Sequence, residues 1–391
     1  MPQHASFSIR YVHLAVTAAM FASSVAMADA DSVIMAQPAQ ILAPVRVESG
    51  SIFSQTESAI VRPGQTIEGA QLQRRQAGSL GETLDGLPGI GNADFGPGVG
   101  RPVIRGLQGS RVTVLEDGLR TSDVSGEGVD HVVASDSLRA KSIELIRGPA
   151  ALLYGSGAVG GVVNVVTGRF SPQIEDRVTG RVSAGYGDNG SDRQGYAGIA
   201  VPLSEQFVLR ADVNKRKTND FSIKGYQQTD GGGKKGRLIN SDIDNQSVTF
   251  TGMFSGQHGY LGLGYARWET EYGIPEAFDA RPRAMGGQED EYERISADYD
   301  RFDLRGELYD PFEGVESIRL NLAYTEFHQD EKEYEYERTP QGGTLDEIEL
   351  EAVFMQDELD GRLEINHQTT WDGVGVVGLD FNHIDFRAEG E

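Results

Sequence analysis

The second half of the chain alternates between apolar and polar residues with the period of a β-strand. In residues 207–213, apolar side chains occupy every odd position, and Arg210 and Asp212 fall on the opposite face. The segment 317–327 alternates in the same way. From Arg177 onward, segments of about ten residues with this pattern predict nine strands, at 177–187, 193–201, 207–217, 246–255, 259–269, 299–309, 317–327, 358–368 and 374–386.

The connections between these segments also follow a pattern. Short ones lie at 202–206, 256–258, 310–316 and 369–373, and they alternate with long ones at 218–245, 270–298 and 328–357. The connection 188–192 is the exception, because it is short but falls on the side of the long ones. A soluble β-sandwich would also alternate apolar and polar residues. Short turns at one end and long loops at the other are typical of an outer-membrane β-barrel, which the pattern therefore favours.

The first half of the chain predicts short, mixed elements. Residues 79–89 predict a helix that ends at Gly86 and Pro88, with Ser79 as its N-cap and Glu82 completing a capping box. One face of this helix carries Leu80, Leu84 and Leu87. The glycine-rich stretch 91–100 is expected to be irregular. Strands are expected at 103–105, 111–115, 143–146 and 162–166, with one turn of helix at 150–154.

Three glycines match the G-x-G-x-x-G fingerprint of dinucleotide-binding proteins, namely Gly155, Gly157 and Gly160. That fingerprint needs a strand before the glycines and a helix after them, so that the helix N-terminus faces the pyrophosphate. Here the helical turn comes before the glycines and a valine-rich strand comes after them. The glycines therefore indicate an open, tight turn and not a nucleotide site.

Three motifs follow one another in this half of the chain. The first is Val103-Ile104-Arg105-Gly106, the second runs from Arg111 to Gly118, and the third lies within 147–165. In this order they resemble the plug domain of TonB-dependent outer-membrane receptors. The positions that carry the plug motif are Arg105, Gly106, Arg147, Gly148, Pro149, Tyr154, Gly155, Gly160, Gly161 and Asn164.

The resemblance implies an α+β plug domain inside an antiparallel transmembrane β-barrel. Such a barrel has about 22 strands when it is complete, whereas the alternation here predicts nine. We therefore expect the sequence to be a truncated product or a fragment of a longer receptor. The expected divisions are a signal peptide at 1–28, an extension with a TonB box at 29–50, the plug at 51–170 and the first part of the barrel at 171–391.

Residues 1–28 have the features of a secretory signal peptide. Arg10 supplies the positive charge, an alanine-rich apolar run follows, and Ala26-Met27-Ala28 forms a cleavage site. A transmembrane anchor is the alternative, but the apolar run is shorter than the ~20 residues that a spanning helix needs. Cleavage after Ala28 and localisation in the outer membrane, in contact with its lipid, are expected.

Residues 41–48 predict a short extended segment, because Pro44 disfavours helix at the residue before it. The resemblance implies that this segment is the TonB box, which a TonB-type energy-transducing protein captures as an added strand. A simple linker that leads into the plug is the alternative. The residues assigned to the box are Val45, Arg46, Val47 and Glu48.

Composition narrows the function further. The chain has no cysteine, and its 59 acidic and 35 basic residues give a net charge of −24. The lack of cysteine excludes disulfides and thiolate metal sites, and the acidity argues against nucleic acid as a partner. A hydrophobic content of 38 % suits a barrel with a wet interior. The sequence contains no G-x-S-x-G, H-E-x-x-H or Walker motif, so neither an enzyme nor a tightly bound cofactor is expected.

The plug sequence is most similar to the zinc-uptake branch of these receptors, at 100–107, 129–134 and 150–154. In that branch, an adjacent Asp–His pair on a plug loop helps to hold the metal, and the matching residues here are Asp130 and His131. Carboxylate and imidazole suit Zn²⁺, and the barrel would have to supply further ligands. The alternative is an ordinary capped turn in which His131 is exposed.

The expected barrel loops leave the cargo open. The stretch 270–298 contains no histidine, and His328 begins another long stretch beside Asp330, Glu331 and Glu333. Such carboxylates attract cations but select poorly among them. The leading hypothesis is active uptake of zinc, or of another divalent metal, as the transported substrate. A receptor for a metal chelate such as a siderophore, haem or cobalamin is the alternative. A sensing receptor is less favoured, because it would carry an additional folded domain before the TonB box and only about a dozen residues lie between Ala28 and Ile41.

Overall fold

The computed structural model describes residues 64–155, 157–227, 234–275, 279–282, 288–339, 342–368 and 374–390. The expected signal peptide and TonB box lie outside these residues.

A small mixed sheet forms the centre of residues 64–170. Its strand order is β1-β6-β7-β4-β5, and all neighbours are antiparallel except the parallel pair β4 and β7. The expected strands at 111–115, 143–146 and 162–166 are confirmed as β4, β6 and β7. The bounds are β1 (Gln65–Glu68), β4 (Val112–Glu116), β5 (Leu119–Arg120), β6 (Ser142–Ile146) and β7 (Gly161–Val166).

Two short helices share the hydrophobic core of this sheet, α2 (Gly69–Gln73) and α3 (Leu80–Leu84). Ser79 is the N-cap of α3 and accepts a hydrogen bond from the Glu82 N–H, as its sequence predicts. The Glu82 carboxylate accepts from the Gly78 N–H, so the capping box is displaced by one residue. The helix ends at Leu84, earlier than expected. The three leucines of its apolar face are buried in the same core as Ile67 and Ile143.

The expectation that residues 91–100 are irregular is wrong for 91–94 and 100, which are strand, and holds for the turn at 95–99 between them. Strand β2 (Ile90–Asp94) pairs antiparallel with β3 (Gly100–Ile104). Two glycines of the stretch lie where a side chain would be unfavourable. Gly96 lies in the turn with φ +130°, and Gly100 begins β3, the strand that contacts α3. A Cβ added at Gly81 would lie 2.6 Å from the Arg101 backbone nitrogen, so glycine permits the helix to lie directly on β3.

The glycine-rich stretch before β7 is an open turn, as expected. It follows the 3-10 helix η3 (Gly148–Tyr154), which contains the predicted helical turn. Gly155 has φ +91° and Gly161 has φ +147°, in the region that favours glycine. A Cβ at Gly160 would lie 3.0 Å from the Arg111 carbonyl oxygen. Glycine at these positions therefore lets β7 start beside β4.

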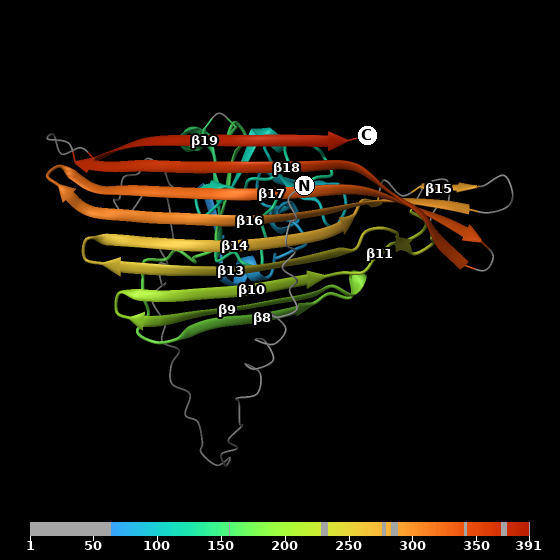
Figure 1. Ribbon diagram of the computed structural model, residues 1–391, viewed down its shortest axis with the longest axis horizontal. Coiled ribbons are helices and arrows are strands. Elements are labelled where there is room, and N and C mark those ends of the chain that lie inside the picture. Colours follow the sequence, from blue (N-terminus) through green and yellow to red (C-terminus); the bar gives the residue numbers. More distant parts are fainter. Residues whose placement is uncertain are drawn as a thin grey trace, which may run out of the picture. The chain divides into compact units, whose positions relative to one another are not determined.

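Nine consecutive strands form a large antiparallel sheet within the described part of residues 179–390 (Figure 1). Their number and order agree with the sequence prediction. A further short strand, β15 (Asp279–Pro282), pairs with β16. The bounds of the nine are β8 (Thr179–Tyr186), β9 (Arg193–Ser204), β10 (Phe207–Lys217), β13 (Ile243–Gly256), β14 (Gly259–Gly273), β16 (Gln288–Phe312), β17 (Val315–Thr339), β18 (Gly342–Gln368) and β19 (Val374–Gly390).

Two of the expected long loops are largely strand, which corrects the sequence prediction. β16, β17 and β18 continue far past their predicted ends, so most of 288–298 and 328–357 is paired. Part of β17, at 332–338, lacks the aliphatic face on which the prediction relied, because charged residues and tyrosines alternate there. Tyrosine favours strands even where neither face is apolar. The third long connection, 218–245, contains the small hairpin of β11 (Phe221–Ser222) and β12 (Arg237–Leu238).

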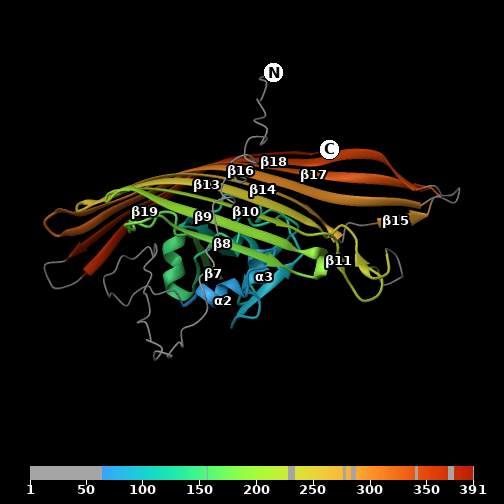
Figure 2. The same cartoon turned by 90° about the horizontal axis from the view of Figure 1, so that it is seen from below.

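The large sheet has an apolar outer face and a polar inner face. On β16, Phe302 and Leu308 are 52 % and 56 % exposed, whereas Arg301, Asp303 and Arg305 are buried. This inversion rules out a soluble β-sandwich and is typical of a barrel wall. Figure 2 shows α2, α3 and β7 on one side of this sheet. Among the described residues, no helix is both long and apolar enough to cross a membrane.

Candidate metal centre between the plug loop and β17

The loop between β5 and β6 carries the predicted pair Asp130 and His131, and the Asp123 side chain organises its first part. Asp123 accepts hydrogen bonds from Thr121 Oγ1, from the Ser125 N–H and, farther along, from the Ala134 N–H. One carboxylate therefore ties both ends of the segment 123–134. Such side-chain bonds to backbone N–H groups order a chain that has no regular structure.

Two further side chains hold this loop from opposite sides. From the plug, Arg101 Nη1 donates to the carbonyl oxygens of Ser125 and Gly128, at 2.7 and 2.8 Å. From β14, the Tyr272 hydroxyl accepts from the Val132 N–H and donates to the Asp130 carbonyl oxygen. The loop is therefore fixed to both the plug and the barrel wall.

His131 is buried, with 4 % of its surface exposed. Its Nδ1 lies 2.9 Å from the Val124 carbonyl oxygen, which can only accept, so Nδ1 carries a proton. The other ring nitrogen, Nε2, lies 2.7 Å from Glu331 Oε1 and 4.0 Å from Asp130 Oδ1. The ring of Phe354 packs edge-on against the imidazole, with ring centroids 5.1 Å apart. The alternative prediction, a capped turn with His131 exposed, is therefore wrong, because His131 is buried.

Asp130, His131 and Glu331 form a cluster whose potential ligand atoms all lie within 4.8 Å of one another. One imidazole nitrogen and two carboxylates make a donor set that suits Zn²⁺ or a similar divalent ion. The bond from Nδ1 to a backbone carbonyl is the usual way in which a metal-binding histidine is oriented. The arrangement is therefore able to hold a cation between the plug loop and β17.

Glu331 is the contribution that sequence reasoning did not single out. It was one of several acidic residues in a stretch expected to be a loop, but that stretch is strand β17. Alternation along β17 turns Glu331 toward His131, whereas His328 and Asp330 contact each other at 3.4 Å on more exposed positions. If the sequence had predicted a strand here, its alternation would have placed Glu331 on the opposite face from Asp330 and Lys332.

The environment raises the pKa of His131 above its ordinary value near 6.5. Burial by itself lowers this pKa, but the hydrogen bonds to Glu331 and to the Val124 carbonyl and the charge of Asp130 outweigh it. A proton on Nε2 and a metal cation are therefore competing partners for the same carboxylates.

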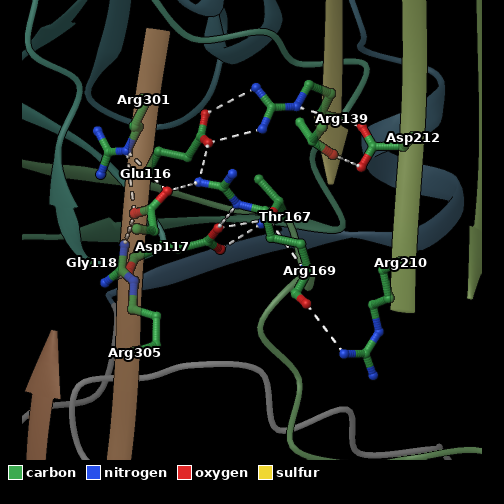
Figure 3. A network of polar contacts seen from close by, with 12 residues as sticks. Glu116, Asp117, Gly118, Arg139, Thr167, Arg169, Arg210, Asp212, Arg301 and Arg305 are labelled. Atoms are coloured by element: carbon green, nitrogen blue, oxygen red, sulfur yellow. Dashed lines mark hydrogen bonds and ion pairs between the residues drawn. The ribbon is translucent and has the colours of Figure 1, made fainter. Parts of the chain in front are cut away.

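A second polar cluster joins the plug to the wall through buried ion pairs (Figure 3). Glu116, at the end of β4, pairs with Arg139 at 3.0 Å and with Arg169 at 3.2 Å. Arg169 also pairs with Asp303 on β16 at 2.7 Å. Burial raises the pKa of Glu116, but the charges of Arg139 and Arg169 outweigh it and hold the pKa below its usual value. Glu116 is therefore an anion that two buried cations share, although Arg169 also pairs with Asp303 and Arg139 with Asp212.

Other bonds of this network run between plug backbone and wall side chains. Arg301 Nη1 donates to the Arg120 carbonyl oxygen at 2.6 Å, and Arg305 Nη1 donates to the Asp117 carbonyl oxygen at 2.9 Å. Buried ion pairs are costly to break one partner at a time. This cluster is therefore a structural contact between plug and wall, separate from the candidate metal centre.

The residues of the plug motif have structural positions, and the structure does not bring them to the metal cluster. Arg105 and Gly106 form a turn with positive φ after β3. Asn164 is fully buried, donates to Glu144 and accepts from the Gly118 N–H. Arg147 donates to the Pro88 carbonyl oxygen, and the ring of Tyr154 lies beneath the Arg362 guanidinium. The other motif residues belong to η3, to the turn that follows it and to the start of β7, namely Gly148, Pro149, Gly155, Gly160 and Gly161.

Residues 57–162 match the family model described as the TonB-dependent Receptor Plug Domain. The chain contains a TonB-dependent receptor plug domain. The antiparallel sheet that follows the plug matches the barrels of such receptors in fold.

Three solved structures illustrate the match of the TonB-dependent receptor fold. The copper transporter OprC is 14 % identical with a TM-score of 0.51, and the match covers 85 % of this chain and 61 % of OprC. BauA, the ferric preacinetobactin receptor from Acinetobacter baumannii, is 14 % identical with a TM-score of 0.53, covering 84 % and 58 %. The ferric citrate transporter FecA in its unliganded form is 13 % identical with a TM-score of 0.53, covering 84 % and 57 %. The matches therefore span about three fifths of each of these proteins, and at these identities they show a common fold.

Proposed function

We propose that this protein is a TonB-dependent outer-membrane receptor that takes up a divalent metal ion, with zinc as its substrate. The observation that carries the proposal is the cluster of His131, Asp130 and Glu331 between the plug loop and β17. A nitrogen and two carboxylates supply the ligand types that Zn²⁺ prefers where thiolates are absent. No chemical reaction is assigned to the chain.

The division of the ligands between plug and wall suggests how a bound ion is released. Asp130 and His131 lie on the plug loop, and Glu331 lies on β17. Movement of the plug away from the wall separates His131 from Glu331, so the ion loses a ligand when the plug shifts. In this proposal a TonB-type partner supplies the work by pulling on residues 45–48 as an added strand.

A metal chelate is the second candidate cargo, because BauA and FecA are described by their ferric chelates. The local packing favours a bare ion. The ring of Phe354 lies against His131. Tyr299, on β16, is buried against Trp268 and is therefore not exposed to a chelate. Glu331 already contacts the imidazole at 2.7 Å.

Uptake by cells tests this proposal. Cells that depend on this receptor are given radioactive zinc at a limiting concentration, alone or with an excess of copper, a ferric siderophore or haem. We expect zinc to accumulate, and we expect His131→Ala to abolish the accumulation. His258→Ala, at an exposed histidine in the turn between β13 and β14, is the matched control. If only a ferric chelate reduces the accumulation of zinc, the protein would be assigned to the chelate receptors.

Cell fractionation tests the proposed location. We expect the receptor in the outer-membrane fraction, without residues 1–28. Recovery of the protein from the soluble periplasm would contradict the proposed membrane location.

A further inference from the structure

Gln329 lies beside the candidate metal centre but belongs to none of the groups assigned to it so far. It lies two residues before Glu331 on β17 and is fully buried. Its Nε2 donates to Glu331 Oε1 at 3.0 Å, the same oxygen that contacts His131 Nε2. Across the sheet, Gln329 pairs directly with Phe354, whose ring packs against His131.

The other end of this amide has no partner. Among the described residues, no hydrogen-bond donor meets Gln329 Oε1. A buried acceptor left unsatisfied destabilises a protein, so such an atom calls for an explanation by an ion, a water or a functional role. Since the carboxylate of Glu331 can only accept, the N–H end of the amide faces it and the oxygen is the end left over.

We propose that Gln329 completes the metal centre, with its side-chain carbonyl oxygen as the fourth donor to the ion. The centre then has two ligands from the plug, Asp130 and His131, and two from one strand of the wall, Gln329 and Glu331. Four donors agree with the tetrahedral coordination of Zn²⁺. This inference rests on the proposed function, because it takes the cluster to be the site of the transported ion.

The i, i+2 spacing on β17 explains how one strand delivers two ligands. Residues two apart on a strand point to the same face, so Gln329 and Glu331 both turn toward the plug. The same pairing occurs on β18, where Gln356 Nε2 donates to Glu358 Oε2 at 3.1 Å. Gln356 differs in one respect, because its Oε1 is not among the unpartnered buried atoms of the described chain. It therefore serves as a matched control.

Zinc titration by calorimetry of the purified receptor tests the inference with three variants. Gln329→Met removes the oxygen and keeps the length of the side chain. Gln329→Glu keeps an oxygen but removes the N–H that faces Glu331. We expect Gln329→Met to weaken zinc binding by roughly tenfold or more, Gln329→Glu to bind at least as tightly as the native protein, and Gln356→Met to leave the affinity unchanged.

Each other outcome has a definite meaning. Equal affinity in Gln329→Met and the native protein would overturn the inference and leave the oxygen to a water molecule. Weakening in both Gln329 variants would also overturn it, because Gln329 would then act only by holding Glu331 with its N–H. If the native receptor itself does not bind zinc, the proposed function fails, and this result is distinct from the other two.

Discussion

His131 of the plug loop and Glu331 of β17 are in direct contact, with 2.7 Å between Nε2 and Oε1. The contact joins the segment that carries the proposed plug ligands to the wall that would enclose the cargo. Because Nδ1 of the same imidazole is held by the Val124 carbonyl oxygen, the ring cannot turn without losing one of the two bonds. The pair therefore has one arrangement, which a shift of the plug disrupts.

We expect zinc affinity to fall as the pH is lowered through a value above 6.5. The pKa of His131 is raised, so its Nε2 becomes protonated at a higher pH than that of an unperturbed histidine, and only the unprotonated nitrogen binds a metal. Calorimetric titrations between about pH 5.5 and 8 measure this dependence. Glu331→Gln removes a group that raises the pKa, so it should move any remaining pH dependence to lower pH. An affinity that is constant over this range would contradict the assignment of His131.

Glu116→Gln should weaken the attachment of the plug to the wall. The substitution leaves Arg139 and Arg169 buried without the carboxylate that they share, and breaking a buried pair in this way costs about 3–5 kcal/mol. Thermal unfolding of the purified protein measures the effect. Glu205→Gln, at an exposed turn between β9 and β10, should leave the unfolding temperature unchanged. Equal unfolding temperatures for Glu116→Gln and the native protein would show that the network does not stabilise the fold.

The same network should be insensitive to pH in the neutral range. Because the pKa of Glu116 is lowered below its usual value of 4.5, its stabilising charge is present above that value and is lost as pH falls through the lowered pKa. Unfolding temperatures measured from neutral pH to below pH 4.5 should therefore show the difference between native protein and Glu116→Gln disappearing only in acid. A difference that disappears near neutrality would place the titrating group elsewhere, for example at His131.

Replacement of Val45 or Val47 by proline should abolish zinc uptake and leave zinc binding intact. Proline removes the backbone N–H that an added strand uses. Uptake by cells and calorimetry of the purified variants measure the two properties separately. Ala36→Pro, upstream of the proposed TonB box, is the control and should transport normally. Unchanged uptake by both valine variants would place the box elsewhere in the chain.

Local signals in the sequence predicted much of the fold. Ser79 and Glu82 fixed the start of α3, and the period-two alternation located nine strands in order. Prediction failed where the signal was missing. The stretch from Lys332 to Arg338 alternates charge with tyrosine and shows no apolar face, so its continuation as strand β17 was not recognised. Glycines at 91–100 concealed a hairpin because glycine is unfavourable in strands except where backbones approach closely.

The residues of the candidate site also fall into a group that the sequence predicted and a group that it did not. Asp130 and His131 are neighbours in sequence and were found by resemblance. Glu331 and Gln329 approach them only through the pairing of β17 and the docking of the plug. No local pattern distinguishes Glu331 from Glu333 or Asp330 before the strand that alternates them is known.

Zinc titration of the purified protein and of its Asp130→Ala, His131→Ala and Glu331→Ala variants tests the central claim most directly. We predict one zinc site per native chain and a loss of roughly tenfold or more in affinity for each variant, with the Glu331 variant affected although it lies on the wall and not on the plug. Equal zinc affinity in all four proteins would contradict the account and would leave the contact between His131 and Glu331 as a structural ion pair.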